Sequence, residues 1–199
     1  MKRIVALLVL CLLLAGCANS HTERAKTVAP LPDTTMEHLT DAVLAVSLKQ
    51  GGAYVDDTGK MQMDLTVYSY DRYDMAEIAA LQVGDTLVRH AGSVKVTSKT
   101  QDAAGICLNG SIHLATDDSG IFYEVGAGNT KNWYPLGDVT IRVSADFKGI
   151  DSIAPERGEV TLYPGDFLVG AVTNYDFTPE NTTVRVENGQ IVEMHRKSN

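Results

Sequence analysis

The segment MQMDLTVYSY, residues 61–70, alternates apolar and polar side chains, and this alternation restricts the fold more than any other feature of the chain. Successive side chains of a β-strand point to opposite faces of a sheet, so a period of two separates a core face from an outer face. The polar face carries two tyrosines, Tyr68 and Tyr70. The core face is predicted to consist of Met61, Met63, Leu65 and Val67.

Short strand-like segments continue through the rest of the chain, separated by glycine-rich turns. They are TLVRH, SVKVTSK, GICL, SIHLAT, IFYEV, VTIRVSA, EVTLYP, DFLVGAVT, TTVRVEN and QIVEMHR. Asn188-Gly189 lies between the last two segments and is typical of a two-residue hairpin turn. Many short antiparallel strands of this kind indicate a mainly β fold with a small barrel-like or sandwich-like body.

One segment of the body has a helical signature. In YDMAEIAALQVGD, Asp74 is placed to be an N-cap, Glu77 follows three residues later, and Gly84 follows the apolar residues. The sequence therefore predicts one short helix at about residues 74–82.

The segment at residues 40–50 fits two structures. A helical stripe would place Met36, Leu39, Val43 and Val46 on one face, and Thr34 with Glu37 resembles a capping box. The surrounding segments are nevertheless strand-like. We favour a strand here.

The chain begins with two cations, Lys2 and Arg3, followed by an apolar run over residues 4–14. This layout is typical of a secretory signal, and the run is shorter than the roughly 20 residues that cross a bilayer. The run leads into LAGC, residues 14–17, which resembles the lipobox of bacterial lipoproteins. The resemblance implies cleavage before Cys17 and attachment of diacylglycerol, with palmitate-like acyl chains, to its thiol. It also implies anchoring to the outer face of the cell membrane, or to the outer membrane where the cell has one.

The predicted signal peptide covers residues 1–16. The next segment is polar, contains Pro30 and Pro32, and lacks a sustained apolar period. We expect residues 17–39 to form a flexible tether, with an arm docked on the body as the alternative. Residues 40–199 are expected to form the β-rich globular domain, which is large enough for one good core or two small β subdomains.

The chain is acidic, with a formal net charge of −8, and loss of Lys2 and Arg3 with the signal peptide would make it two units more negative. This balance argues against nucleic acid as a partner and against polybasic docking on anionic lipid.

Cys107 would be the one unmodified cysteine of the mature chain, so we expect no internal disulfide. Its apolar neighbours in GICLNG predict a buried, unreactive thiol.

No sequence pattern points to catalysis, to a cofactor or to a metal. The chain lacks the GxSxG motif, and its histidines lack zinc-site spacing. DDTG at residues 56–59 and DDSG at residues 117–120 place paired carboxylates beside a glycine, but the remaining ligands of a calcium loop are missing. Turn formation is the favoured interpretation of both.

The loop at residues 126–138, GAGNTKNWYPLGD, contains the single tryptophan of the chain. Aromatic rings and amides on a loop suit the binding of a sugar ring, whereas packing of the tryptophan against the body is the alternative. The tyrosines on the polar face of the strand at residues 61–70 pose the same choice. The candidate ligand-binding residues are Trp133, Tyr134, Asn129, Asn132, Tyr68 and Tyr70.

Together these features favour a lipid-anchored, non-enzymatic binding or interaction module of the cell envelope. Its membrane contact would be the lipid on Cys17, and its partner would be a glycan, a peptide or another envelope protein. The alternatives are a small envelope hydrolase and an accessory subunit of an envelope complex.

Overall fold

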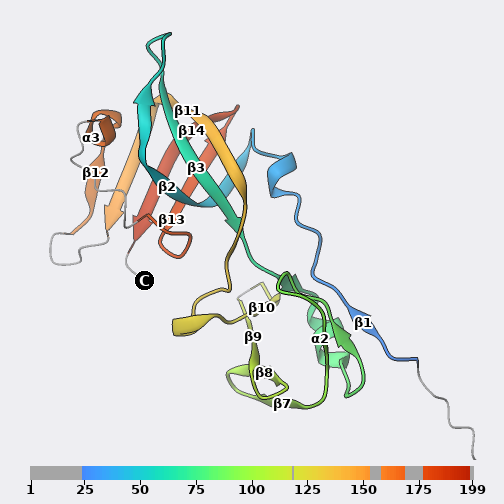
Figure 1. Cartoon of the computed structure of the whole chain (residues 1–199). Coiled ribbons are helices and arrows are strands. Elements are labelled where there is room, and N and C mark those ends of the chain that lie inside the picture. The colour runs from blue at the N-terminus through green and yellow to red at the C-terminus, as the bar shows by residue number, and fades with distance from the viewer. Residues whose placement is uncertain (1–23, 118, 153–157, 169–176, 198–199) are drawn as a thin grey trace, which may run out of the picture.

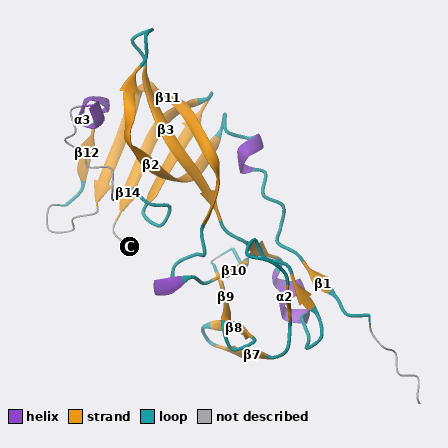
Figure 2. Ribbon diagram, viewed as in Figure 1, coloured by secondary structure: helices purple, strands orange, loops and turns teal. Residues whose placement is uncertain are grey.

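The computed structural model describes residues 24–117, 119–152, 158–168 and 177–197. The predicted signal peptide and Cys17 lie outside this part of the chain. The described fold is mainly β, as predicted, with two short helices where one was expected. Figure 1 shows a large barrel and a smaller body beside it, which we call the barrel and the small lobe, and Figure 2 shows that strands dominate the barrel.

The barrel consists of a ring of five strands and one added edge strand. The ring strands are β2 (Ala42–Val55), β3 (Met61–Ser69), β11 (Tyr134–Ser152), β13 (Thr182–Glu187) and β14 (Gln190–Lys197), and the edge strand is β12 (Val160–Leu162). The ring runs β2–β3–β11–β14–β13 and closes from β13 to β2. Only the β11–β14 pair of the ring is parallel, which is the connectivity of an OB-type Greek-key barrel.

The predicted alternation of β3 fills the barrel. Met63, Leu65 and Val67 are fully buried, and they pack with apolar side chains of the other ring strands.

The segment at residues 40–50 is a strand, as we favoured. Val43 is 68% exposed and Val46 is fully buried, so the two do not share the face that a helix would give them. Thr34 is the N-cap of a single 3-10 turn, Thr35–Glu37, and its side chain makes no capping hydrogen bond there.

A hairpin turn and a strand irregularity of the barrel each depend on a glycine. Asn188 and Gly189 have φ values of 50° and 70°, which confirms the predicted hairpin turn between β13 and β14. A register shift in β2 lies between Leu48 and Ala53. A Cβ at Gly52 would lie 2.9 Å from the carbonyl oxygen of Asp64, so only glycine fits this close approach of β2 to β3.

The strand predicted for DFLVGAVT is wrong at its start. Residues Pro164–Leu168 form helix α3, because the fixed φ of proline suits a first helical turn and Asp166 accepts the Tyr163 backbone N–H at 2.7 Å. Phe167 of this helix packs edge-on against Phe147 of β11, with ring centroids 5.9 Å apart. The segment after Leu168 lies outside the described residues.

The small lobe is inserted between β3 and β11 and is built from short strands. One sheet has the order β4 (Arg72–Tyr73), β10 (Phe122–Glu124), β9 (Ile112–Thr116), β8 (Gly105–Leu108) and β7 (Lys99–Asp102). A second sheet has the order β1 (Thr27–Val28), β5 (Thr86–Leu87) and β6 (Val94–Lys95). The buried apolar residues of the small lobe form a cluster distinct from that of the barrel.

The predicted helix is α2, Met75–Ala80, in the small lobe. Asp74 is its N-cap and accepts the Glu77 backbone N–H at 3.0 Å, as the sequence indicated. The helix ends before Gly84 because Leu81 already has an extended backbone. The ammonium of Lys99 then donates to three carbonyls at this end of the helix, those of Ile78, Ala79 and Leu81.

Residues 24–41 form an arm that lies against both bodies, which is the docked arm that the sequence left open as the alternative to a flexible tether. Val28 of β1 is fully buried in the small-lobe core. Farther along, the Leu31 backbone N–H donates to the Arg72 carbonyl at 2.6 Å, and the Gly189 backbone N–H donates to the Thr40 carbonyl at 2.9 Å. Short polar segments dock in this way when they supply strand hydrogen bonds and a buried side chain, which proline content alone does not reveal.

Candidate functional site

Three aromatic rings gather on the small lobe where it meets the barrel. Tyr70 lies edge-on to Trp133 and to Tyr123, with ring centroids 5.0 Å and 6.0 Å apart. The Lys131 ammonium lies 4.1 Å from the Tyr70 ring centroid and 5.6 Å from the centroids of the other two rings. All four side chains are partly exposed. We call this set the aromatic cluster.

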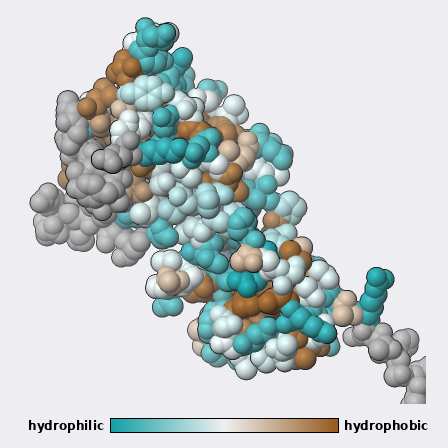
Figure 3. All heavy atoms as spheres, in the orientation of Figure 1, coloured by the Kyte–Doolittle hydropathy of each residue, from teal (hydrophilic) through white to brown (hydrophobic). Residues whose placement is uncertain are grey.

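A cavity of about 480 Å³ adjoins the aromatic cluster, on the outer face of the five-stranded sheet. Its walls include the Tyr123 ring, His113 and the loop residue Asn129, and Asp102 lies at its rim. Figure 3 shows hydrophobic side chains gathered in a strip on the visible face of the small lobe. The volume lies within the roughly 300–1,000 Å³ range of small-molecule sites.

The sheet is hollowed because small residues occupy the middle of its outer face. Gly105 and Ala115 face outward between larger neighbours, and Ala115 pairs directly with Tyr123 across β9 and β10. Gly105 cannot be replaced without strain, since a Cβ there would lie 2.1 Å from the Leu114 carbonyl oxygen. The alternation of β10 then turns Tyr123 outward while Phe122 and Glu124 are buried.

The prediction of a buried Cys107 is wrong. Ile106 and Leu108 both face the core of the small lobe, so strand alternation turns the thiol between them to the outer face. Its sulfur lies 4.0 Å from Nε2 of His113, its direct cross-strand partner. Cys107 therefore forms part of the cavity lining.

The six predicted ligand-binding residues do not gather in one place. Trp133 and Tyr70 belong to the aromatic cluster, and Asn129 lines the cavity. Asn132 is exposed in the same loop, where its backbone N–H donates to the Glu124 carbonyl at 3.1 Å. Tyr68 lies on the outer face of the barrel, where its hydroxyl accepts a 3.3 Å hydrogen bond from Ser47.

Tyr134 belongs to the junction of the two bodies rather than to the cavity. Its ring stacks on His90 with centroids 3.8 Å apart and planes at 3°. Burial, reinforced by the charge of Asp71, raises the pKa of Tyr134. Asp71 is itself buried and accepts the His90 backbone N–H at 2.7 Å. These contacts fix the connection between barrel and small lobe.

Asp56 and Asp117, the first residues of the two DD[ST]G segments, make the same set of hydrogen bonds. Asp56 Oδ1 accepts the backbone N–H groups of Thr58 and Lys60, and Asp117 Oδ1 accepts the corresponding groups of Ser119 and Ile121. The hydroxyl of Thr58, like that of Ser119, donates to the same oxygen. These bonds hold the pKa of Asp56 and of Asp117 below the ordinary value. The carboxylates therefore act as turn residues.

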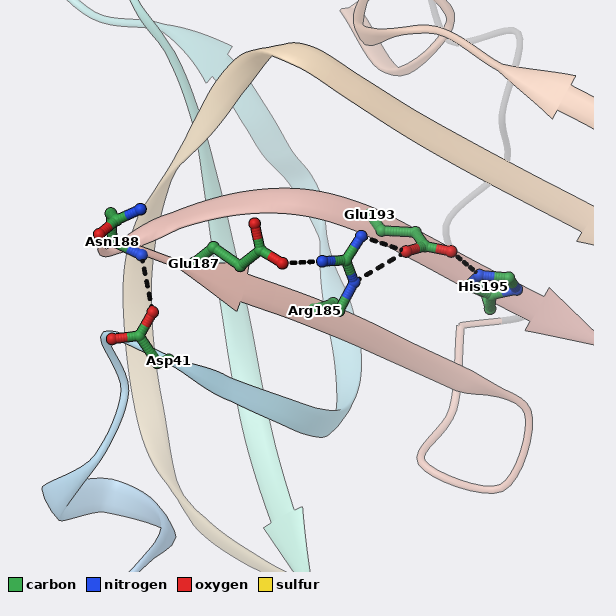
Figure 4. A network of polar contacts seen from close by, with 6 residues as sticks. All are labelled: Asp41, Arg185, Glu187, Asn188, Glu193 and His195. Atoms are coloured by element: carbon green, nitrogen blue, oxygen red, sulfur yellow. Dashed lines mark hydrogen bonds and ion pairs between the residues drawn. The ribbon is translucent and has the colours of Figure 1, made fainter.

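A network of charged side chains lies on the barrel, around the β13–β14 hairpin (Figure 4). Arg185 donates to Glu193 at 2.6 Å and 2.8 Å and pairs with Glu187, while His195 contacts the other oxygen of Glu193. The hydrogen bonds from His195 and Arg185 lower the pKa of Glu193. Because opposite charges pair across and along the strands, this network stabilises the hairpin.

Two other features are absent from the described part of the chain, a metal-binding cluster and a membrane-spanning helix. No three His, Cys, Asp or Glu side chains of residues 24–117, 119–152, 158–168 and 177–197 are grouped to hold a metal ion. Across the same residues, no helix has the length and apolar character needed to span a bilayer.

Comparison with known proteins found no matching family model, no matching curated protein and no matching solved structure. The site is therefore described by its own geometry. The sequence indicated Trp133, Tyr70 and Asn129 but missed Tyr123 and His113. Their signal was present in the alternation of IFYEV and SIHLAT, but only the pairing of β8, β9 and β10 brings these side chains to one cavity.

Proposed function

We propose that this chain is a lipid-anchored, non-enzymatic binding module of the bacterial cell envelope, and that its ligand is a saccharide held in the small-lobe cavity. The observation that carries the proposal is the open cavity with the Tyr123 ring on its wall. The lipobox-like segment at residues 14–17 supports export and anchoring through Cys17.

A sugar ring has apolar C–H faces and a rim of hydroxyl groups. The faces pack on aromatic rings, and the hydroxyls need both donors and acceptors. Tyr123 offers a ring, and the nearby Cys107, Ala115 and Val125 provide an apolar floor. Asp102, His113 and Asn129 surround this floor with a carboxylate, an imidazole and an amide. The cavity thus offers both kinds of contact.

Other envelope ligands fit these features less well. The net charge of −8 disfavours polyanions such as nucleic acids. A peptide bound by strand addition would require a free sheet edge, whereas the cavity lies on a sheet face. The direct route to the ligand is therefore a screen of cell-wall fragments and glycans.

The test uses the mature acylated protein in detergent, compared with its Tyr123→Ala variant. We expect binding of at least one saccharide class and an about tenfold loss in Tyr123→Ala, equivalent to roughly 1.4 kcal/mol. Tyr54→Ala is the matched control, because Tyr54 is partly exposed on the barrel. Absence of saccharide binding, or equal binding by Tyr123→Ala, would refute the ligand assignment. Cleavage of a bound saccharide would instead support the hydrolase alternative.

The anchor has a separate test. Mass spectrometry of the membrane fraction should show an acyl mass on Cys17, and the Cys17→Ser variant should lose both that mass and membrane association. A wild-type chain without acyl mass would exclude the anchor and leave the saccharide test unaffected.

A further inference from the structure

We propose that the small lobe rests on the bilayer surface by the end where the arm enters it, and that the barrel is held away from the membrane. This inference rests on the proposed lipid anchor at Cys17. It assigns an interaction surface to the exposed residues around the arm entry, namely Arg24, Lys26, Gln82, Val83 and Lys95.

The arm is fixed to the small lobe from Lys26 onward. The Lys26 backbone N–H donates to Asp85 Oδ1 at 2.7 Å, and its carbonyl accepts the Thr86 backbone N–H at 2.8 Å. Two residues later the side chain of Val28 is fully buried. The attachment point is therefore a part of the folded small lobe.

Chain length then limits the distance from the membrane. Only eight residues lie between Cys17 and Lys26, and the nine steps from one to the other span at most about 30 Å when fully extended. In Figure 1 the arm enters the small lobe at the end of the molecule opposite the barrel. An acylated Cys17 would therefore keep the small lobe, and not the barrel, close to the lipid.

The surface at this end suits contact with headgroups. Val83 is an apolar side chain that is 67% exposed, at a turn beside the arm entry. Lys95 projects from the outer face of the three-stranded sheet, in the row of Thr27 and Thr86. Together with Arg24 and Lys26 it places three cations at this end of a chain whose net charge is −8. Cations near anionic lipid are attracted, and exposed apolar tips enter the interface.

Two acidic residues at this end, Asp85 and Glu77, are engaged in contacts within the small lobe. Asp85 is buried, and its carboxylate accepts the backbone N–H groups of Lys26 and Gln82. Glu77 lies 3.6 Å from the Lys26 ammonium and pairs with that one cation. Arg24 and Lys95 are thus the cations placed to meet headgroups. The net charge of −8 is a sum over the whole chain and does not describe the placement of cations at this end.

The test measures energy transfer from a dye on the acylated full mature chain to acceptor lipids in vesicles. A Cys107→Ser background leaves no other free thiol once Cys17 is acylated, so Val83→Cys and Asp57→Cys each accept one dye. Asp57 lies in the exposed turn between β2 and β3, on the barrel. We expect transfer at residue 83 to be at least about twofold higher than at residue 57, because the tether limits its distance to about 30 Å.

Charge reversal tests the surface itself. Arg24→Glu with Lys95→Glu should lower the transfer at residue 83 in vesicles containing anionic lipid, and the matched control Lys60→Glu on the barrel turn should leave it unchanged. Equal transfer at residues 83 and 57, or no effect of the charge reversal, would overturn the proposed contact surface. Acyl mass on Cys17 is verified in every sample, so failure of the anchor is recognised separately.

Discussion

The barrel and the small lobe bury their cores by different means. In the barrel, each ring strand has a hydrogen-bonded neighbour on both sides, and the enclosed cluster is aliphatic and phenylalanine. The small lobe has two short open sheets, and polar groups are buried beside its apolar cluster. Both bodies bury polar side chains, since Arg196 of β14 is buried in the barrel and pairs with Asp151 of β11. The small lobe differs in that its sheets are open and its core is completed by Val28 of the docked arm.

The polar pairs of the small lobe lie at its boundary with the barrel. Arg89 makes two hydrogen bonds of 2.7 Å to the carboxylate of Glu124, and both side chains are largely buried. The hydrogen bonds to Glu124 raise the pKa of Arg89. The hydroxyl of the buried Tyr73 donates to the Val88 carbonyl at 3.0 Å. Loss of one of these partners would leave a buried polar group unpaired, which makes the small lobe sensitive to single polar changes.

The largest expected loss of stability comes from truncating a buried leucine in either core, and it tests whether the two cores unfold separately. Leu65→Ala in the barrel and Leu108→Ala in the small lobe each remove a fully buried side chain, and each should lower the free energy of unfolding by about 4 kcal/mol. Urea unfolding would be followed by Trp133 fluorescence and by far-ultraviolet circular dichroism. We expect Leu108→Ala to shift the fluorescence transition to lower urea than the dichroism transition. Coincident transitions in Leu108→Ala would show that the two bodies unfold as one unit.

Breaking the Arg89–Glu124 ion pair should give the next largest loss of stability. Arg89→Met should cost about 3 kcal/mol, because Glu124 would remain as a buried carboxylate without its cation. The double variant Arg89→Met with Glu124→Leu should recover most of this loss, since neither charge remains. Thermal unfolding of the single and double variants measures the difference. A double variant as unstable as Arg89→Met would mean that the pair contributes through packing rather than through charge.

The smallest effect is a pH dependence confined to the small lobe. Burial, reinforced by Asp71 and Glu124, raises the pKa of Tyr73, so its folded pKa lies above the ordinary value of about 10. The stability from the neutral hydroxyl is fully present below pH 10 and is lost as the pH rises toward the folded pKa. Tyr73→Phe should cost only about 1 kcal/mol at neutral pH and should flatten this alkaline slope. An unchanged slope in Tyr73→Phe would assign the alkaline loss to other groups.

Elements whose structure depends on neighbouring residues in the sequence were predicted correctly. The strand at residues 61–70, the turn at Asn188-Gly189 and the cap at Asp74 depend on neighbours in sequence, and all three are present. Prediction from the sequence failed where distant segments decide. The arm docks because β5 lies open to pair with Thr27 and Val28, and nothing in the arm's own composition indicates that partner.

The candidate site was likewise predictable from the sequence only in part. The aromatic and amide character of the loop at residues 126–138 was evident from the sequence, and so was the outward alternation of β10. The cavity was not, because it requires Gly105 and Ala115 to lie side by side and Tyr123 and Asn129 to stand around them. These positions are brought together by strand register, which is a long-range property.

By itself the sequence determined the mainly β class, the alternation that fills the barrel and the local turn and cap chemistry, because each follows from short-range periodicity and backbone preference. The closure of the ring through β11, the exposure of Cys107, the docked arm and the cavity were decided only by the tertiary structure. Each of these depends on hydrogen bonds or packing between segments far apart in the chain, and no local pattern specifies which segments meet.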